Sequence, residues 1–369
     1  MIDVRIYTIA DLEERLQSGN FWTGDVVPIT KHRALSQIRN PRARPNDVVL
    51  LVAYNDERVV GYIGVLPDSV FVSGEMRRIG WLTAWWANPD SKFAGIGLVL
   101  MAKALKIYGG AIGASGFSDA AKKVYESSKQ FITITESVRM KLFVRANSYE
   151  FLPRKSPVLK NLGPLLRLLD FSLNIFCGLR LRLWKRRFGI GESCRLEYVA
   201  EVDSQTASFI GQLQGDELTK RGAAEINWIA QHPWVLASPI GTSDNGSFYF
   251  SSTARDSICL MVKVFSPEKA MIGFIMLRVI NGHLTVPYCY MLENCADKIL
   301  AVIGEHVVAL QVHTVTVCRA ELRDAIVRQS FPCVSRKSES RSWIIGNVFK
   351  AKLLEGLEMQ DGDGDCAFC

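Results

Sequence analysis

Alternating apolar and polar residues predict several strands in the first ninety positions of the chain. Two runs rich in valine, leucine and isoleucine flank Asn55-Asp56-Glu57, which suits a hairpin turn. A third run, RRIGWLTAWWA at 77–87, follows after a short polar connection. Three successive runs of this kind predict an antiparallel meander.

Helical spacing replaces this alternation directly after the meander. Leu98, Met101 and Leu105 share one face if residues 98–108 are helical, which predicts a helix there. These elements place residues 1–150 in an α+β domain with a mainly antiparallel sheet. The other elements expected in this domain are strands at 2–9, 110–116 and 131–145, and helices at 11–18, 29–38 and 118–131.

Residues 195–350 repeat the same order of elements. Asn281-Gly282 marks a hairpin between two apolar runs in this second half. The repeat lies in the order of elements, since no residue-by-residue repeat is visible. The fold class expected for the whole chain is therefore α+β, with two domains that each hold a mainly antiparallel mixed sheet flanked by helices.

The linker at 151–194 is apolar and basic at once. Its longest charge-free run, between Asp170 and Arg180, has nine residues, whereas about twenty are needed to cross a bilayer. Two interpretations remain open. Either the segment is an interdomain helix whose apolar face packs on the protein, or it lies on an anionic membrane through the basic stretch 179–188.

The last residues, 351–369, are acidic and rich in glycine, which predicts a disordered tail.

Composition narrows the classes of function. The chain has 369 residues, a net charge of +7 and a hydrophobic content of 48%, which suits two folded domains. We expect no nucleic-acid partner, because no basic, aromatic-rich motif is present. The start of the chain lacks the pattern of a signal peptide, and the nine cysteines are scattered. These features favour a cytoplasmic protein, peripheral to the inner face of the membrane if the linker binds lipid, and no metal site is expected.

A helix that begins on glycines carries the candidate chemistry. Glycine costs about 1 kcal/mol in a helix, so Gly95 and Gly97 suggest that a ligand must approach the backbone. The first N–H groups of a helix lack partners, and the helix dipole is positive there, so such a start suits an anion. Lys92 would add a full positive charge just before the turn.

The run PDSKFAGIG around these glycines resembles the acetyl-CoA loop of the GNAT (GCN5-related) N-acyltransferases. That loop reads Arg or Gln, two residues, Gly, one residue, then Gly or Ala. Gly95 and Gly97 match it, and Lys92 stands at the Arg or Gln position. Farther along, Ala121 and Tyr125 fit the second helix of the family, although YESSKQF replaces its usual Tyr-x-x-x-Gly-Phe ending.

The resemblance covers residues 1–150. Because the second half has the same element order, it implies a tandem GNAT-like protein. The corresponding stretch of the second half, ENCAD at 293–297, has no glycine pair and no basic residue. The second domain is therefore expected to lack a phosphate loop.

The resemblance also implies roles for individual residues. Acetyl-CoA would be the acyl donor, an amine would attack it directly, and Tyr125 would protonate the departing thiolate. Backbone amides at the helix start would hold the pyrophosphate, and the pantetheine arm would pair with the edge of the 77–87 strand. The implied cofactor-binding residues are Ala87, Lys92, Phe93, Ala94, Gly95, Ile96, Gly97, Leu98 and Ser118.

The acceptor expected from this reading is an amine of a small molecule or of a glycan precursor. Two alternatives are a Fem-type aminoacyl transferase, which also has a tandem GNAT fold, and a non-catalytic module that binds CoA. The glycine loop argues against the first of these. The general base is open, since Glu75, Asp90 and His32 are candidates by residue type only. The oligomeric state is also open.

Overall fold

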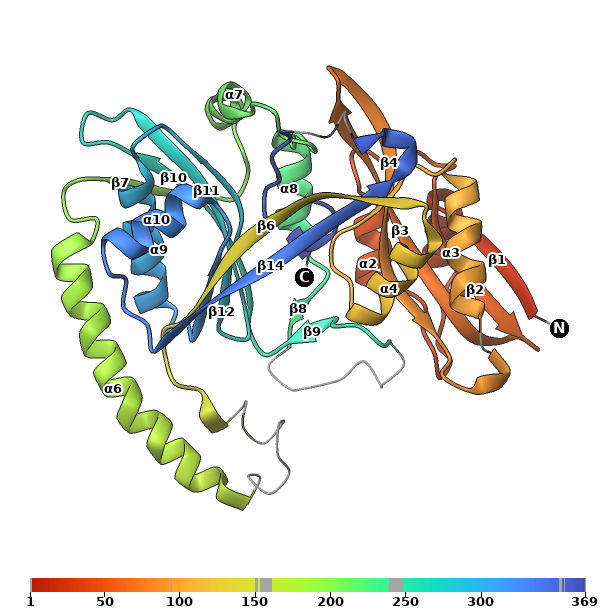
Figure 1. Ribbon diagram of the computed structural model, residues 1–369, viewed down its shortest axis with the longest axis horizontal. Coiled ribbons are helices and arrows are strands. Elements are labelled where there is room, and N and C mark those ends of the chain that lie inside the picture. Colours follow the sequence, from red (N-terminus) through yellow and green to blue (C-terminus); the bar gives the residue numbers. More distant parts are fainter. Residues whose placement is uncertain are drawn as a thin grey trace. The chain divides into compact units, whose positions relative to one another are not determined.

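A computed structural model describes residues 2–93, 95–149, 152, 161–238, 248–351, 354 and 356–368. Strands and helices together make an α+β protein (Figure 1). The chain divides into two units, each built from separate stretches of sequence. Unit 1 comprises Met1–Ser137, Glu201–Arg255 and Ser342–Cys369, and unit 2 comprises Val138–Ala200 and Asp256–Arg341.

The sheet of unit 1 has the strand order β1-β2-β3-β4-β5-β14. The first four strands form the predicted antiparallel meander, β5 runs parallel to β4, and the end of β14 is antiparallel to β5. Asp56 and Glu57 make the hairpin between β2 and β3 with φ of 48° and 65°. The bounds are β1 Ile2–Thr8, β2 Val48–Asn55, β3 Arg58–Val72, β4 Glu75–Ala87, β5 Ile112–Ala114 and β14 Ser335–Gly346.

Helices pack on both faces of this sheet. On one face α3 and α4 share a hydrophobic cluster with β2, β3 and β4, and on the other face α1 and α2 share a second cluster with β1 and β2 (Figure 1). A two-stranded parallel sheet, β8 Leu236–Ala237 with β9 Thr253–Ala254, also belongs to unit 1. The helices of unit 1 are α1 Ile9–Gln17, α2 Lys31–Ile38, α3 Ile96–Ile107, α4 Asp119–Ser128, α7 Ser204–Leu213 and α8 Ala223–Gln231.

The sheet of unit 2 repeats this plan with the order β7-β10-β11-β12-β13-β6. Its first four strands are antiparallel, β13 runs parallel to β12, and the end of β6 is antiparallel to β13. Asn281 and Gly282, with φ of 49° and 70°, make the hairpin expected from the sequence. The bounds are β6 Phe131–Phe143, α6 Gly163–Phe188, β7 Arg195–Val199, β10 Ser257–Phe265, β11 Met271–Ile280, β12 His283–Met291, α9 Ala296–Ala309, β13 Thr314–Val317 and α10 Ala320–Arg328.

The two boundaries near β6 and β14 fall inside these strands. In sequence β6 follows the first set of elements, yet its residues Met140–Phe143 pair with β13 of unit 2. Likewise β14 follows the second set, and its Ile344 and Ile345 pair with β5 of unit 1. The units therefore interleave along the chain, unlike the consecutive domains 1–150 and 195–350 expected from the sequence.

The C-terminal segment also differs from expectation. Residues 360–365, 367 and 368 are buried in unit 1, whereas acidic composition predicted a disordered tail at 351–369. Phe368 explains part of this order, because its ring stacks on Trp234 at 4.5 Å and meets Trp228 edge-on at 4.9 Å. The Asp363 and Asp365 carboxylates also hold the segment in place, because they accept hydrogen bonds from the Thr219 and Ser115 hydroxyls.

Candidate functional site

Strands β4 and β5 of unit 1 part from one another. β4 pairs with β5 only at Gly80 and Trp81, so the following residues, Leu82–Ala87, have β3 on one side. Within the part of the chain that the structure describes, no strand pairs with their other side. This leaves a strand edge that can accept an extended ligand.

A bulge shapes the same stretch of β4. Thr83 pairs with Gly64 and Trp86 with Tyr62, so Ala84 and Trp85 together oppose the single residue Ile63. Ala84 adopts φ of 44°, which a non-glycine residue rarely takes. Bulges turn side chains and backbone groups away from the regular ladder, often beside active sites. Here the bulge lies on the open edge.

β4 leads directly into the glycine helix start. Gly95 caps α3 with φ of 87°, a left-handed conformation that glycine adopts without strain. The first bond within the helix runs from Val99 N–H to the Gly95 carbonyl at 3.1 Å, so the N–H groups of residues 96–98 precede it. No acidic residue lies in the first turn of α3. The start of α3 can therefore hold an anion.

Trp85 connects this helix start to Tyr125. A Cβ atom placed on Gly97 would lie 3.2 Å from Nε1 of Trp85, so glycine permits this close contact. The Trp85 and Tyr125 rings lie 5.6 Å apart, and Phe131 packs edge-on against Tyr125 at 5.0 Å. Burial raises the pKa of Tyr125 above its ordinary value, and the Asp365 carboxylate adds to this shift. Tyr125 therefore remains protonated, as a proton donor must.

Asp365 reaches the same region from the C-terminal segment. The Ser115 hydroxyl, just after β5, donates to Oδ1 of Asp365 at 2.6 Å. The neighbouring Gly364 lies close to Ser115 and Trp81, since a Cβ atom there would be 2.3 Å from the Ser115 hydroxyl and 3.4 Å from the Trp81 ring. Burial raises the pKa of Asp365, and the Ser115 hydrogen bond opposes that change. A carboxyl group with a raised pKa thus lies where β4 and β5 part.

Buried ion pairs fix Trp81 and the tail at this point. Asp68 of β3 accepts hydrogen bonds from Trp81 Nε1 at 3.0 Å, from Arg42 at 2.8 Å and from Arg221 at 2.9 Å. Arg221 also donates to the Gly364 carbonyl at 3.1 Å. All of these side chains are buried or nearly so, which makes such charge-assisted bonds strong.

A small cavity lies on the opposite face of the bulge. It is lined by residues that include Arg33, Gln37, Thr83, Ala84, Trp234 and Phe248. The Arg33 guanidinium lies over the Trp234 and Phe248 rings at 4.7 and 4.9 Å. Arg33 also contributes to the electrostatic environment of Asp365, where it lowers the pKa of that carboxyl. The cavity has a volume of about 10 Å³, which leaves room for about one water molecule beside Arg33.

Comparison with solved structures identifies the fold. An Enterococcus faecalis V583 protein of unknown function, described as a probable N-acyltransferase, superposes with a TM-score of 0.51 at 12% identity, over 94% of this chain and 73% of that one. A GCN5-related N-acetyltransferase from Anabaena variabilis ATCC 29413 gives a TM-score of 0.50 at 14% identity, over 93% and 72%. The fold is that of the GCN5-related N-acetyltransferases. No family model matches the sequence, and no curated protein matches it either.

The GNAT fold gathers most of the residues predicted from the loop. Ala87 ends β4, Phe93 and Ile96 are buried under the start of α3, and Gly95 and Gly97 shape that start. Ala94 lies outside the described residues.

The other predicted residues lie around this start. Ser118 caps α4, where its hydroxyl accepts from Ala121 N–H at 3.3 Å. Leu98 is exposed on α3, and Lys92 is exposed and pairs with Asp90 at 3.2 Å. Lys92 can thus reach an anion only by exchanging this partner.

The three candidate bases lie elsewhere or have other partners. Asp90 pairs with Lys92, and Glu75 lies at the first residue of β4, exposed and near Arg77. Nε2 of His32 lies 2.8 Å from the Trp234 carbonyl oxygen. None of these three side chains has a contact that links it to Tyr125 among the described residues.

Sequence reasoning missed the C-terminal carboxyl group. Asp365 lies 240 positions after Tyr125 (365 minus 125) in a stretch that reads as a polar tail. Its only local signal is the aromatic residue Phe368, which follows an otherwise polar glycine-rich run. No pattern in that run predicts that it packs against the sheet of unit 1.

The described residues contain no group of three or more histidine, cysteine, aspartate or glutamate side chains placed to hold a metal ion. They also contain no helix with the length and apolar character needed to span a bilayer.

Proposed function

We propose that unit 1 is an N-acyltransferase that moves an acyl group from acyl-CoA, acetyl-CoA in the simplest case, to an amine. The acceptor would be a small molecule or a glycan precursor that carries a primary amine. The described residues that build the site all belong to unit 1. Unit 2 would then have a different role.

One observation carries this proposal: the open edge of β4 runs directly into the glycine start of α3. An acyl-CoA molecule has an anionic diphosphate joined to an arm with amide groups. The helix start supplies N–H donors and a positive dipole for the diphosphate. The edge at Leu82–Ala87 supplies backbone groups for the amides of the arm. The thioester would then lie near Tyr125 and Asp365.

The side chains present support direct transfer. The amine nitrogen attacks the thioester carbonyl carbon, its proton passes to the Asp365 carboxylate, and the carbon–sulfur bond breaks. The Tyr125 hydroxyl gives its proton to the departing thiolate, and the tyrosinate recovers a proton from Asp365 through solvent. A base with a raised pKa removes a proton near neutral pH more effectively than an ordinary aspartate, which suits Asp365.

The test measures binding and turnover separately. Coenzyme A is titrated into the full chain by calorimetry, and free thiol release from acetyl-CoA is followed with a panel of amino sugars, amino acids and peptides. We expect coenzyme A to bind and at least one amine to accelerate thiol release. Tyr125→Phe should bind coenzyme A unchanged and slow the release about tenfold or more.

Two outcomes would contradict the proposal. Absence of coenzyme A binding would remove the donor, and binding without acyl transfer to any amine would favour a CoA-binding module. Phe117→Leu is the matched control, because Phe117 packs on Tyr125 at 5.6 Å and carries no ionisable group. A loss of turnover equal to that of Tyr125→Phe would mean that packing, not the hydroxyl, matters.

A further inference from the structure

The helix α6 of unit 2 exposes an unusual number of apolar side chains. Its buried face contains Leu166, Asp170, Leu181 and Trp184. Trp184 packs on α9, where Gly304 makes room for its ring, and donates to the Gln329 carbonyl at 3.2 Å. The Asp170 carboxylate accepts from the Ser148 and Tyr149 N–H groups at 2.8 and 2.9 Å. These contacts fix which face of α6 points outward.

The outward face of α6 is an apolar stripe that only Ser172 interrupts. At 100° per residue its members lie within about 120° of one another, on one side of the helix, and each is between 48% and 68% exposed. A soluble helix normally presents polar side chains on this face. The stripe consists of Leu165, Leu168, Leu169, Ile175, Phe176, Leu179 and Leu183.

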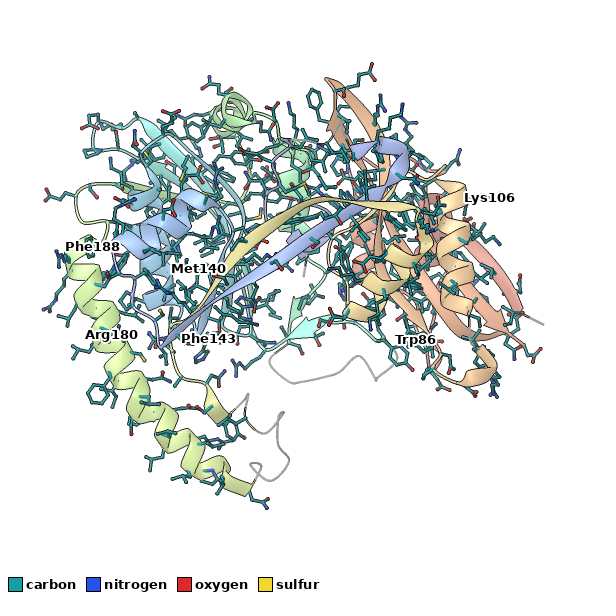
Figure 2. All side chains as sticks on the ribbon, in the orientation of Figure 1. Trp86, Lys106, Met140, Phe143, Arg180 and Phe188 are labelled. Atoms are coloured by element: carbon teal, nitrogen blue, oxygen red, sulfur yellow. The ribbon has the colours of Figure 1, made fainter. Side chains whose placement is uncertain are left out.

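Basic residues flank this stripe toward the C-terminal end of α6. Arg180 lies in the second half of α6, where it donates to the Cys333 carbonyl at 3.4 Å, and Phe188 marks the end of the helix (Figure 2). At 100° per residue, Arg186 and Arg187 fall on either side of the line through Leu179 and Leu183. In the part of the chain that the structure describes, Arg182, Arg186 and Arg187 form no ion pair and are exposed.

The charges of α6 are almost all of one sign. It contains six basic residues and one acidic residue, a net charge of +5 (6 minus 1), and the acid, Asp170, is buried. A second copy of this chain, packed through the same face, would set one helix of net charge +5 against another, which is unfavourable. An anionic lipid surface instead offers hydrocarbon for the stripe and phosphate groups for its flanks.

We propose that α6 lies in the plane of an anionic membrane surface, with the leucine and phenylalanine stripe below the headgroups and the arginines among them. The helix has 26 residues, about 39 Å of length at 1.5 Å per residue, which gives a long line of contact. It does not cross the bilayer, because charged residues interrupt both ends. The proposal does not depend on the function of unit 1.

The experiment is co-sedimentation of the full chain with vesicles of two compositions. One is pure phosphatidylcholine, and the other contains about one third phosphatidylglycerol. We expect binding to the anionic vesicles, weakened by salt, and far weaker binding to the neutral ones. Leu168→Ser with Phe176→Ser should lower binding to anionic vesicles by about tenfold or more.

A charge variant separates the two contributions. Arg186→Gln with Arg187→Gln should lower the affinity for anionic vesicles by about thirtyfold and leave the weak affinity for neutral vesicles unchanged. The controls are Val327→Ser on α10 and Lys337→Gln on β14, which are exposed residues of unit 2 outside α6. Both should bind like the unchanged protein.

Several results would overturn the proposal. They are an absence of binding to anionic vesicles, equal binding to both vesicle types, or a control variant that binds as poorly as the stripe variant. Light scattering of the vesicle-free protein tests self-association. If the stripe variant converts a stable oligomer to a monomer while vesicle binding is absent, the stripe is an interface between copies.

Discussion

The junction of β4 with α3 in unit 1 and the junction of β12 with α9 in unit 2 have the same topology and opposite chemistry. Both strands pair with a parallel neighbour over only a short part of their length, at Gly80–Trp81 in β4 and at His283–Thr285 in β12. In unit 2 the Arg319 guanidinium donates to the Cys289 carbonyl of β12 at 2.8 Å. The Cys289 carbonyl, which an extended ligand would need as a hydrogen-bond acceptor, thus already accepts from the Arg319 side chain.

The starts of α3 and α9 also differ in how well they suit an anion. α3 begins at Gly95 with no acid in its first turn, whereas α9 begins at Cys295 and carries Asp297 in its first turn. A carboxylate at that position stabilises the helix but repels an anionic ligand. Asn294 takes the left-handed conformation just before α9, with φ of 62°. The fold thus provides the opening in both units, and a few residues decide whether an anion can bind there.

The largest effect expected concerns the tail, which has no equivalent beside β12 among the described residues. Burial raises the pKa of Asp363 to about 7 from 3.8. At a pH between these two pKa values, the Asp363 carboxyl is deprotonated in the unfolded chain and still protonated in the folded chain. The free energy of unfolding therefore falls as the pH rises from about 4 to about 7. The full shift corresponds to about 4 kcal/mol.

Asp363→Asn removes this titration. Its free energy of unfolding in urea should therefore depend less on pH between about 4 and about 7 than that of the unchanged protein. An equal dependence in both proteins would show that the Asp363 carboxyl ionises normally in the folded state.

Asp365→Asn tests the proposed base beside β4. An asparagine keeps the size of the side chain and cannot take the proton of the amine, so kcat should fall about a hundredfold while coenzyme A affinity stays the same. Asp363→Asn is the matched control, since it changes a buried carboxyl of the same segment that does not act on Tyr125. If both variants lose equal activity, the tail acts only through its structure.

Arg319→Ala tests the closed edge of unit 2. It leaves the Cys289 carbonyl without this donor and should lower the free energy of unfolding by about 2 kcal/mol. We expect no gain in coenzyme A binding, because Asp297 remains in the first turn of α9 and no glycine begins that helix. A second equivalent of bound coenzyme A, seen by calorimetry, would show that Arg319 alone closes this edge.

Gly95→Ala is the mildest change and tests the open edge. A Cβ atom meets nothing within 4 Å there, yet φ of 87° strains any residue other than glycine. Coenzyme A affinity should fall about tenfold as the helix start distorts. Asn294→Ala, at the left-handed position before α9, should leave the coenzyme A affinity unchanged. An equal loss of affinity in this variant would show that the start of α9 also takes part in binding coenzyme A.

Local patterns predicted much of this structure. The Asn55-Asp56-Glu57 and Asn281-Gly282 turns, the meander and the glycine start of α3 all follow from short stretches whose neighbours in space are also neighbours in sequence. Predicted strand runs at 131–145 form one continuous strand, β6, with bounds Phe131–Phe143. The elements themselves were thus visible.

Long-range pairing was not visible in the same way. Neither β6 nor β14 signals which sheet it will join, because the apolar pattern of a strand fits either partner. The acidic residues of the tail read as solvated, although Thr219 donates to Asp363 at 2.5 Å and Ser115 donates to Asp365. Such partners, more than a hundred positions away, can only be read from the folded chain.

The pairing of β5 with the end of β14 has a consequence for biosynthesis. Ala114 pairs with Ile344, 230 positions later (344 minus 114). At roughly 5–20 residues per second a ribosome needs about 12–46 seconds to cover that interval. During this time the nascent chain carries β5 with one bare edge, the kind of surface on which chains aggregate. We expect folding in the cell to depend on a chaperone that shields this edge until the last strand emerges.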